Sequence, residues 1–148
     1  MLVQAVLMGS PISRYDLQSL ASTKLSDSQL LFENGRNSNA YYLAGYSIEL
    51  GLKACIARMM LPDVIPDKQL INSIYVHDLN KLLGVAGLRA ELENEAKRNP
   101  RLQENWDIVA QWTEESRYQQ TEKALAHYLL SAVVEENHGI FPWIKKHW

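Results

Sequence analysis

Three features that would assign a protein to a class at once are scarce in this sequence. Cys55 is its only cysteine, which excludes an intramolecular disulfide and disfavours a zinc site built from cysteines. No apolar run approaches the ~18 residues that a membrane helix needs. The 15 Lys and Arg nearly balance the 17 Asp and Glu, so any binding of nucleic acid needs a local patch rather than a general basic field. We therefore expect a cytoplasmic protein that does not enter a membrane.

What the sequence does contain is enough apolar material for the core of one domain. It has 148 residues, of which 47% are hydrophobic and 22% are charged, an ordinary globular balance. Residues 1–8 are apolar apart from Gln4, but the run is short and no Lys or Arg precedes it, which argues against a signal peptide. We interpret residues 1–12 as a flexible or docking N-terminal arm, or in part as a start-site artefact. Residues 13–148 then form a single helical-bundle domain.

Apolar residues recur at helical spacing along almost the whole chain. A first predicted helix begins at Ser13 or Asp16 and ends at Asn34-Gly35, because glycine accepts the left-handed conformation of a helix C-cap. A second predicted helix covers residues 37–60 and carries two apolar stripes that leave only a narrow polar ridge. This pattern is typical of a central, largely buried helix.

The rest of the chain alternates shorter helices with connecting segments. Pro62 and Pro66 mark residues 61–76 as a loop. The predicted elements after it are a short helix over 79–86, a solvated helix over 88–98, a helix opened by Asn99-Pro100, and a turn over 113–120. A last predicted helix starts at Thr121 and breaks at Gly139 and Pro142. Its expected buried residues are Leu125, Leu129 and Val133. The sequence therefore predicts an all-α fold, an up-and-down bundle of about five to six helices.

The short motifs that mark common catalytic and metal sites are missing. The sequence has no Gly-rich phosphate loop, no His-Glu-x-x-His, no Gly-x-Ser-x-Gly elbow and no EF-hand loop. Its four histidines do not pair at the spacing of helical metal ligands; they are His77, His127, His138 and His147. We expect no metal site and no cofactor.

One candidate site lies on the polar ridge of the second predicted helix. Glu49 and Lys53 are four residues apart and share a face, with Tyr42 and Tyr46 on the same row. Two interpretations stay open at this point. The pair is either an exposed ion pair worth a few tenths of a kcal/mol, or a partly buried pair that other polar groups orient.

Two glycines in the same helix need an explanation of their own. Gly45 and Gly51 each cost about 1 kcal/mol relative to alanine inside a helix. Such a cost is tolerable where another backbone or a ligand approaches closely. We therefore expect a close neighbour at both positions.

Two polar clusters interrupt the joins between predicted helices. His77-Asp78 precedes the short third helix, where Asp78 is either a plain helix cap or part of a site with His77. Ser116-Arg117-Tyr118 precedes the last helix, where Arg117 either packs its stem on Trp112 at the surface or binds a ligand. An arginine flanked by Trp112 and Tyr118 would also form a stacking platform for a base.

Taken in order, these segments resemble a known family. Residues 39–54 (NAYYLAGYSIELGLKA) look like the central helix of HEPN domains, the higher eukaryote and prokaryote nucleotide-binding domains. The order continues with His77-Asp78-Leu79 and with Trp112 before Ser116-Arg117-Tyr118. The ending Phe141-Pro142-Trp143-Ile144-Lys145 is similar to that of a stand-alone prokaryotic subgroup, so the resemblance spans about residues 17–148.

The resemblance implies a helical bundle that commonly dimerises and acts on nucleotides or RNA. Members bind nucleotides or RNA, cleave RNA as toxins, or accompany small nucleotidyltransferases, often in toxin–antitoxin or defence systems. Ribonuclease members carry an arginine followed, after four to six residues, by a histidine. Here nine residues separate Arg117 from His127, so this sequence departs from the catalytic pattern.

Three functional hypotheses follow from these residues. In the first, the protein binds a nucleotide or an RNA end in an interhelical groove, where the ligand-binding residues are Glu49, Lys53, His77, Arg117 and Tyr118. Arg117 and Lys53 would bind phosphate, while Tyr118 stacks on a base. In the second, the same residues form a structural network in a non-catalytic module that docks a nucleotidyltransferase-type or antitoxin partner.

The third hypothesis is a metal-independent endoribonuclease toxin in which a dimer brings Arg117 and His127 together. A homodimer is also expected from the aromatic content, because four tryptophans are more than a small bundle readily hides; they are Trp106, Trp112, Trp143 and Trp148. The sequence does not decide whether the protein is an enzyme.

Overall fold

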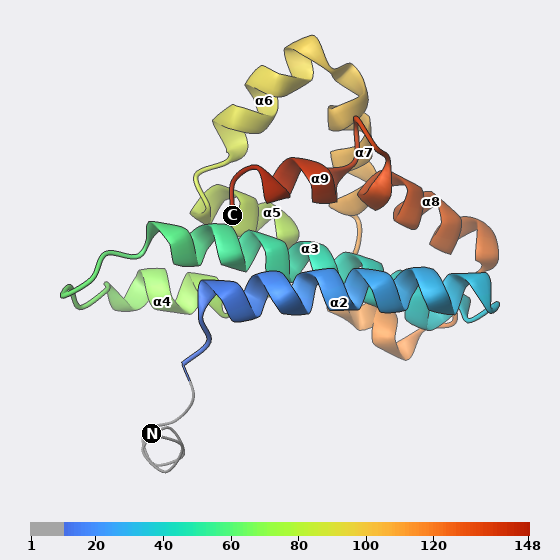
Figure 1. Cartoon of the computed structure of the whole chain (residues 1–148), viewed down its shortest axis with the longest axis horizontal. Helices are drawn as coiled ribbons and strands as arrows, with labels where there is room; N and C mark the ends of the chain where they lie inside the picture. The colour runs from blue at the N-terminus through green and yellow to red at the C-terminus, as the bar shows by residue number, and fades with distance from the viewer. Residues whose placement is uncertain (1–10) are drawn as a thin grey trace.

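A computed structural model describes residues 11–148, and this part of the chain is helical without any strand. Figure 1 shows α2 (Arg14–Glu33), α3 (Asn37–Met59), α4 (Lys68–Ile74), α5 (Leu79–Val85), α6 (Arg89–Arg98), α7 (Pro100–Val109), the 3-10 helix η1 (Glu114–Tyr118), α8 (Lys123–Val134) and α9 (Ile140–Lys145). The predicted all-α bundle is confirmed, with eight α-helices in the described part rather than five to six. Of the predicted N-terminal arm, residues 1–10 lie outside the described residues.

Helices α2 and α3 form an antiparallel pair (Figure 1). The ends of α2 follow from the chemistry of a few local residues. Ser13 caps α2 through a reciprocal capping box with Asp16, whose backbone N lies 3.0 Å from the Ser13 Oγ. Gly35 adopts a positive φ of 74° just after the C-cap Asn34, as the sequence predicts. The chain therefore reverses within a few residues, and α3 packs along α2.

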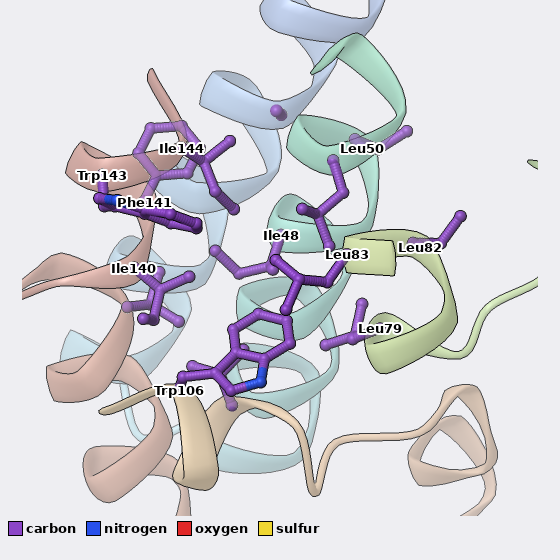
Figure 2. Close-up of a cluster of buried hydrophobic side chains, with 14 of the residues drawn as sticks. Ile48, Leu50, Leu79, Leu82, Leu83, Trp106, Ile140, Phe141, Trp143 and Ile144 are labelled. Carbon is purple, nitrogen blue, oxygen red and sulfur yellow. The ribbon is translucent and has the colours of Figure 1, made fainter. Parts of the chain in front are cut away.

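Helix α3 is the central element of the bundle. It contributes more buried residues than any other helix of the described part and packs against α2, α5, α8, α9 and η1. Both predicted stripes face the interior over most of their length, except that Met59 is exposed near the C-terminal end of α3. Figure 2 shows the core that surrounds α3, to which α3 itself, α5, α7 and α9 contribute Ile48, Leu50, Leu79, Leu82, Leu83, Trp106, Ile140, Phe141, Trp143 and Ile144.

The segment after α3 is more ordered than the sequence suggests. The predicted loop over residues 61–76 contains α4, whose N-cap is Asp67. The Asp67 carboxylate accepts hydrogen bonds from the backbone N–H groups of Gln69 and Leu70 at 3.1 and 3.3 Å. This cap outweighs the loop signal of the two prolines that precede it. The prediction of a loop is therefore wrong for residues 68–74.

The inner face of α8 was also predicted only in part. Leu129 and Val133 are buried, but Leu125 is exposed and Ala126 and Leu130 take part in the buried face instead. Two steps of four residues rotate a row by roughly 80° around a helix of 3.6 residues per turn, so residue 125 leaves the face that 129 and 133 define. The helix itself begins after Glu122, one residue later than the expected Thr121 cap.

The C-terminal segment folds as part of the core. Gly139 is the N-cap of α9 and Pro142 lies in the first turn of this helix, where a missing N–H costs no hydrogen bond. The predicted break is therefore the start of another helix. Two hydrogen bonds join α3 to this C-terminal segment. The Cys55 thiol donates to the Ile144 carbonyl in α9 at 3.9 Å, and Arg58 donates to the carbonyl of His147, just after α9, at 3.3 Å.

The tryptophans do not form an exposed surface. Trp106, Trp112 and Trp143 are buried within the single chain, and half-buried Trp148 makes an edge contact with Phe141 at 5.5 Å between ring centroids. The argument that four tryptophans require a second copy is therefore wrong, and the homodimer rests on the family resemblance alone. None of the helices in residues 11–148 combines the length and the apolar character that a membrane crossing requires.

Candidate functional site

A buried carboxylate lies at the centre of the candidate site. Glu49 is only 2% exposed on α3, and Lys53, one turn later, donates from its Nζ to Glu49 Oε2 at 3.0 Å. The second oxygen, Oε1, lies 2.9 Å from His77 Nδ1. The interpretation of Glu49–Lys53 as an exposed ion pair is thus wrong, since a third polar group orients the pair inside the protein.

The position of His77 follows from the start of α5. The next residue, Asp78, is the N-cap of α5 and accepts from the backbone N–H of Lys81 at 3.1 Å. Asp78 is therefore a helix cap, as one of the two interpretations had it, and this cap fixes the backbone that presents His77. The His77 side chain remains 48% exposed, so its Nε2 is free to meet a ligand while Nδ1 holds Glu49.

These three side chains line the polar wall of a pocket between α3 and α4. The pocket has a volume of about 710 Å³, and Tyr46 lies on the same wall. Burial, followed by the charge of Glu49 and the neighbouring Tyr42, raises the pKa of Tyr46, so its hydroxyl stays a donor at neutral pH. Most other lining side chains are aliphatic, and they come from the end of α3, the segment 60–66 and α4. Pockets of this size and composition are typical of ligand sites in proteins.

A second cluster lies along the same face of α3, toward its N-terminus. The Arg117 guanidinium lies 4.9 Å from the centre of the Tyr118 ring, and both residues are exposed. Tyr118, with a smaller contribution from Tyr42, raises the pKa of Arg117. Tyr42 also lies 5.8 Å from Tyr46 between ring centroids. Tyr42 and Tyr46 therefore connect the Arg117–Tyr118 pair with the pocket.

The structure does not bring all the predicted residues into one groove. Glu49, Lys53 and His77 meet in the pocket, whereas Arg117 and Tyr118 are absent from its lining. A buried network between Arg117 and Glu49 is wrong, because the partners of Glu49 are Lys53 and His77. The predicted site residues thus form two separate clusters along α3.

His127 lies elsewhere. It is exposed on α8, stacks on Phe32 at 5.8 Å between ring centroids, and borders a different cavity of about 570 Å³ together with Arg101. In residues 11–148 no hydrogen bond or ring contact joins His127 to Arg117. Within residues 11–148 of one chain, Arg117 and His127 therefore do not form the pair that the endoribonuclease hypothesis requires.

The close neighbours expected at the two glycines are side chains. A Cβ atom at Gly45 would lie 2.2 Å from Cγ of Trp112, and one at Gly51 would lie 3.1 Å from Cγ2 of Ile144. Trp112 is buried and contacts Tyr42 at 6.0 Å between ring centroids, whereas the Arg117 guanidinium lies over the Tyr118 ring. Gly45 thus seats the indole that supports the second cluster.

Sequence reasoning missed the apolar half of the pocket because it missed α4. The signal was present as an Asp cap at position 67 followed by Leu70, Ile71 and Ile74 at three-to-four spacing. In the described residues no group of three or more His, Cys, Asp or Glu side chains is placed to hold a metal ion.

Comparison of the chain with protein-family models, with curated proteins and with solved structures finds no match. Nothing beyond the sequence motifs therefore bears on the HEPN resemblance, which stays a prediction. Only the geometry of the pocket and of the Arg117–Tyr118 cluster bears on what this chain could bind.

Proposed function

We propose that this protein binds a nucleotide or an RNA end along the face of α3 that carries Tyr42, Tyr46 and Lys53, with a base at the polar wall of the α3–α4 pocket. The observation that carries the proposal is buried Glu49, which holds Lys53 and His77 at the edge of an apolar pocket of about 710 Å³. A mainly apolar pocket with a few oriented polar groups suits a flat, partly polar ring.

The polar groups of the pocket suit a base or a sugar, and Arg117 suits a phosphate. Glu49 neutralises Lys53, so this wall is not strongly cationic, but Nζ keeps two further donors for a base or sugar oxygen. His77 offers its second ring nitrogen, and Tyr46 offers a hydroxyl. Phosphate is better served by Arg117, an exposed guanidinium whose planar fork binds phosphate oxygens in pairs.

The distance between the two clusters favours an RNA end over a single nucleotide. Tyr42, Tyr46, Glu49 and Lys53 follow one another on α3 at spacings of four, three and four residues, so they share one face. Eleven residues of helix extend for roughly 16 Å at 1.5 Å per residue. A stacked strand advances about 3.4 Å per nucleotide, so this row matches roughly four to five nucleotides.

The test compares labelled RNA oligonucleotides with mononucleotides by fluorescence anisotropy and calorimetry. We expect Arg117→Ala to weaken RNA binding about 10- to 150-fold, which corresponds to about 1.5–3 kcal/mol for a hydrogen bond to a charged group. Arg117→Lys should restore binding only in part, because the planar fork is lost. Arg98→Ala is the matched control, since Arg98 is exposed on α6 and pairs only with Glu95.

Two outcomes would contradict the proposal. One is an absence of RNA and nucleotide binding by the folded wild-type protein, and the other is an equal effect of Arg117→Ala and Arg98→Ala. Either result would favour the module that docks a nucleotidyltransferase-type or antitoxin partner. Cleavage of the RNA by the wild-type protein, lost in His127→Ala, would instead favour the endoribonuclease.

A further inference from the structure

Exposed apolar side chains gather on one side of the α3–α4 pocket. Of the 13 large hydrophobic residues that are exposed in the described part, seven line this pocket: Ile12, Met59, Leu61, Val64, Ile65, Leu70 and Tyr75. We call the last six of these the apolar shelf; it belongs to the end of α3, the segment after it and α4 with its C-cap. Ile65 is 95% exposed. A concentration of this kind marks an interaction surface rather than scattered surface residues.

The chain itself leads onto this surface. Ile12 precedes the Ser13 cap of α2 and is one of the residues that line the pocket. Residues 1–13 carry no charged side chain, and seven of the eight residues from Met1 to Met8 are apolar. We propose that residues 1–8 dock on the apolar shelf, so that the N-terminal segment covers the α4 side of the pocket.

Chemistry and reach both favour this occupant. Of the charged side chains that line the pocket, Glu49 and Lys53 pair with each other on the polar wall, and the Asp67 carboxylate is engaged as the cap of α4. An uncharged apolar segment therefore covers the shelf without removing an unpaired charge from water. Ala5 is seven residues from Ile12, which permits a span of up to about 25 Å. Tethering also gives the segment an effective concentration in the millimolar range, which an untethered partner must exceed.

A pair of introduced cysteines tests the contact directly. The native Cys55 is buried, and this burial raises the pKa of its thiol to about 12, so it does not compete in thiol exchange. We expect Ala5→Cys with Val64→Cys to form an intramolecular disulfide in a glutathione buffer. The matched control is Ala5→Cys with Leu125→Cys, because residues 64 and 125 are similarly exposed, at 57% and 52%, and α8 lies away from α4 (Figure 1).

The readout is the effective concentration of the two thiols, measured from the ratio of disulfide to reduced protein by mass spectrometry. A value at least tenfold higher for the Val64 pair than for the Leu125 pair supports the proposal. Equal values overturn it. A disulfide that links two chains, seen as a band of twice the mass on a non-reducing gel, also overturns it, because the occupant is then a second copy.

A second measurement uses the segment without any crosslink. Val6→Asp places a charge among the apolar residues of the segment and leaves the described core untouched. If residues 1–8 cover the shelf, this variant should bind a hydrophobic dye severalfold more strongly than the wild type, and Gln4→Asp should do so less. Unchanged dye fluorescence in Val6→Asp would refute the docking. This inference does not depend on the ligand of the polar wall, so it can fail while RNA binding is observed, and the reverse.

Discussion

Adding one methyl group at Gly45 tests whether the packing of Trp112 on α3 sets the shape of the candidate site. The new Cβ would lie 2.2–2.3 Å from Cγ, Cδ1 and Cδ2 of Trp112, which form the base of the indole. Cγ is bonded to the Trp112 Cβ, so a rotation of the indole about the Cβ–Cγ bond does not move it away from the new methyl group. The whole side chain must shift, although it is 2% exposed and enclosed by neighbours.

Two opposing contributions decide the size of the effect. Alanine is favoured over glycine by about 1 kcal/mol inside a helix. Overpacking a close-packed core costs about 1–3 kcal/mol, and a contact this short on an enclosed indole belongs at the upper end of that range. We therefore expect Gly45→Ala to lower the free energy of unfolding by about 1–2 kcal/mol, measured by chemical denaturation with an unchanged slope.

The control and the rescue use the same chain. Gly84→Ala, in α5, meets only the end of the Arg89 side chain at 3.7 Å and should stabilise by about 0.5–1 kcal/mol. Trp112→Ala removes Cγ, Cδ1 and Cδ2, the three atoms that clash, so Gly45→Ala should cost less in that background than in the wild type. A Gly45→Ala variant as stable as the wild type would refute the reasoning.

Three further predictions concern the core and its titrating groups. Leu52→Ala removes a side chain with no exposed surface and should cost about 2–5 kcal/mol in chemical denaturation; a loss below about 1 kcal/mol would contradict the burial of α3. Hydrogen bonds from Asn105 and then Arg101 lower the pKa of Glu135 in the folded protein. The contribution of Glu135 to stability is therefore present above pH 4.5, its ordinary pKa, and is lost as the pH falls through the folded-state pKa. Glu135→Gln should flatten the acid limb of a stability–pH profile, and an unchanged acid limb would contradict this. Cys55 should react with a thiol reagent at pH 8 only at the rate of unfolding, and rapid labelling of the native protein would contradict its burial.

Local sequence signals predicted both ends of α2 and the starts of α5 and α7, but they did not predict the short helix α4. Ser13 and Gly35 act within three or four residues, so their effect on α2 can be read directly from the chain. Helix α4 is only seven residues long, and its N-cap Asp67 follows Pro66 in a segment whose prolines predict a loop. Short helices are stabilised by packing on other elements, which a single sequence does not display.

The candidate site shows the same division. The i,i+4 spacing of Glu49 and Lys53 predicted that they share a face, and it raised the prospect of burial. The sequence hypothesis placed His77 in one groove with Glu49 and Lys53, but the hydrogen bond between His77 and Glu49 depends on how α5 packs against α3, which a single sequence does not show. The separation of Arg117 from this cluster follows likewise from the path of η1, a tertiary feature.

The seat of α9 on α3 also determines when this protein can fold. Ile140, Phe141, Trp143 and Ile144 are buried against a helix that precedes them by about 90 residues, as the Cys55–Ile144 contact shows. During synthesis the side of α3 that α9 covers therefore emerges about 90 residues before the residues that bury it. Helices α2 and α3 pair within the part of the chain made first, whereas the core between α3 and α9 closes only after residue 145 has been added.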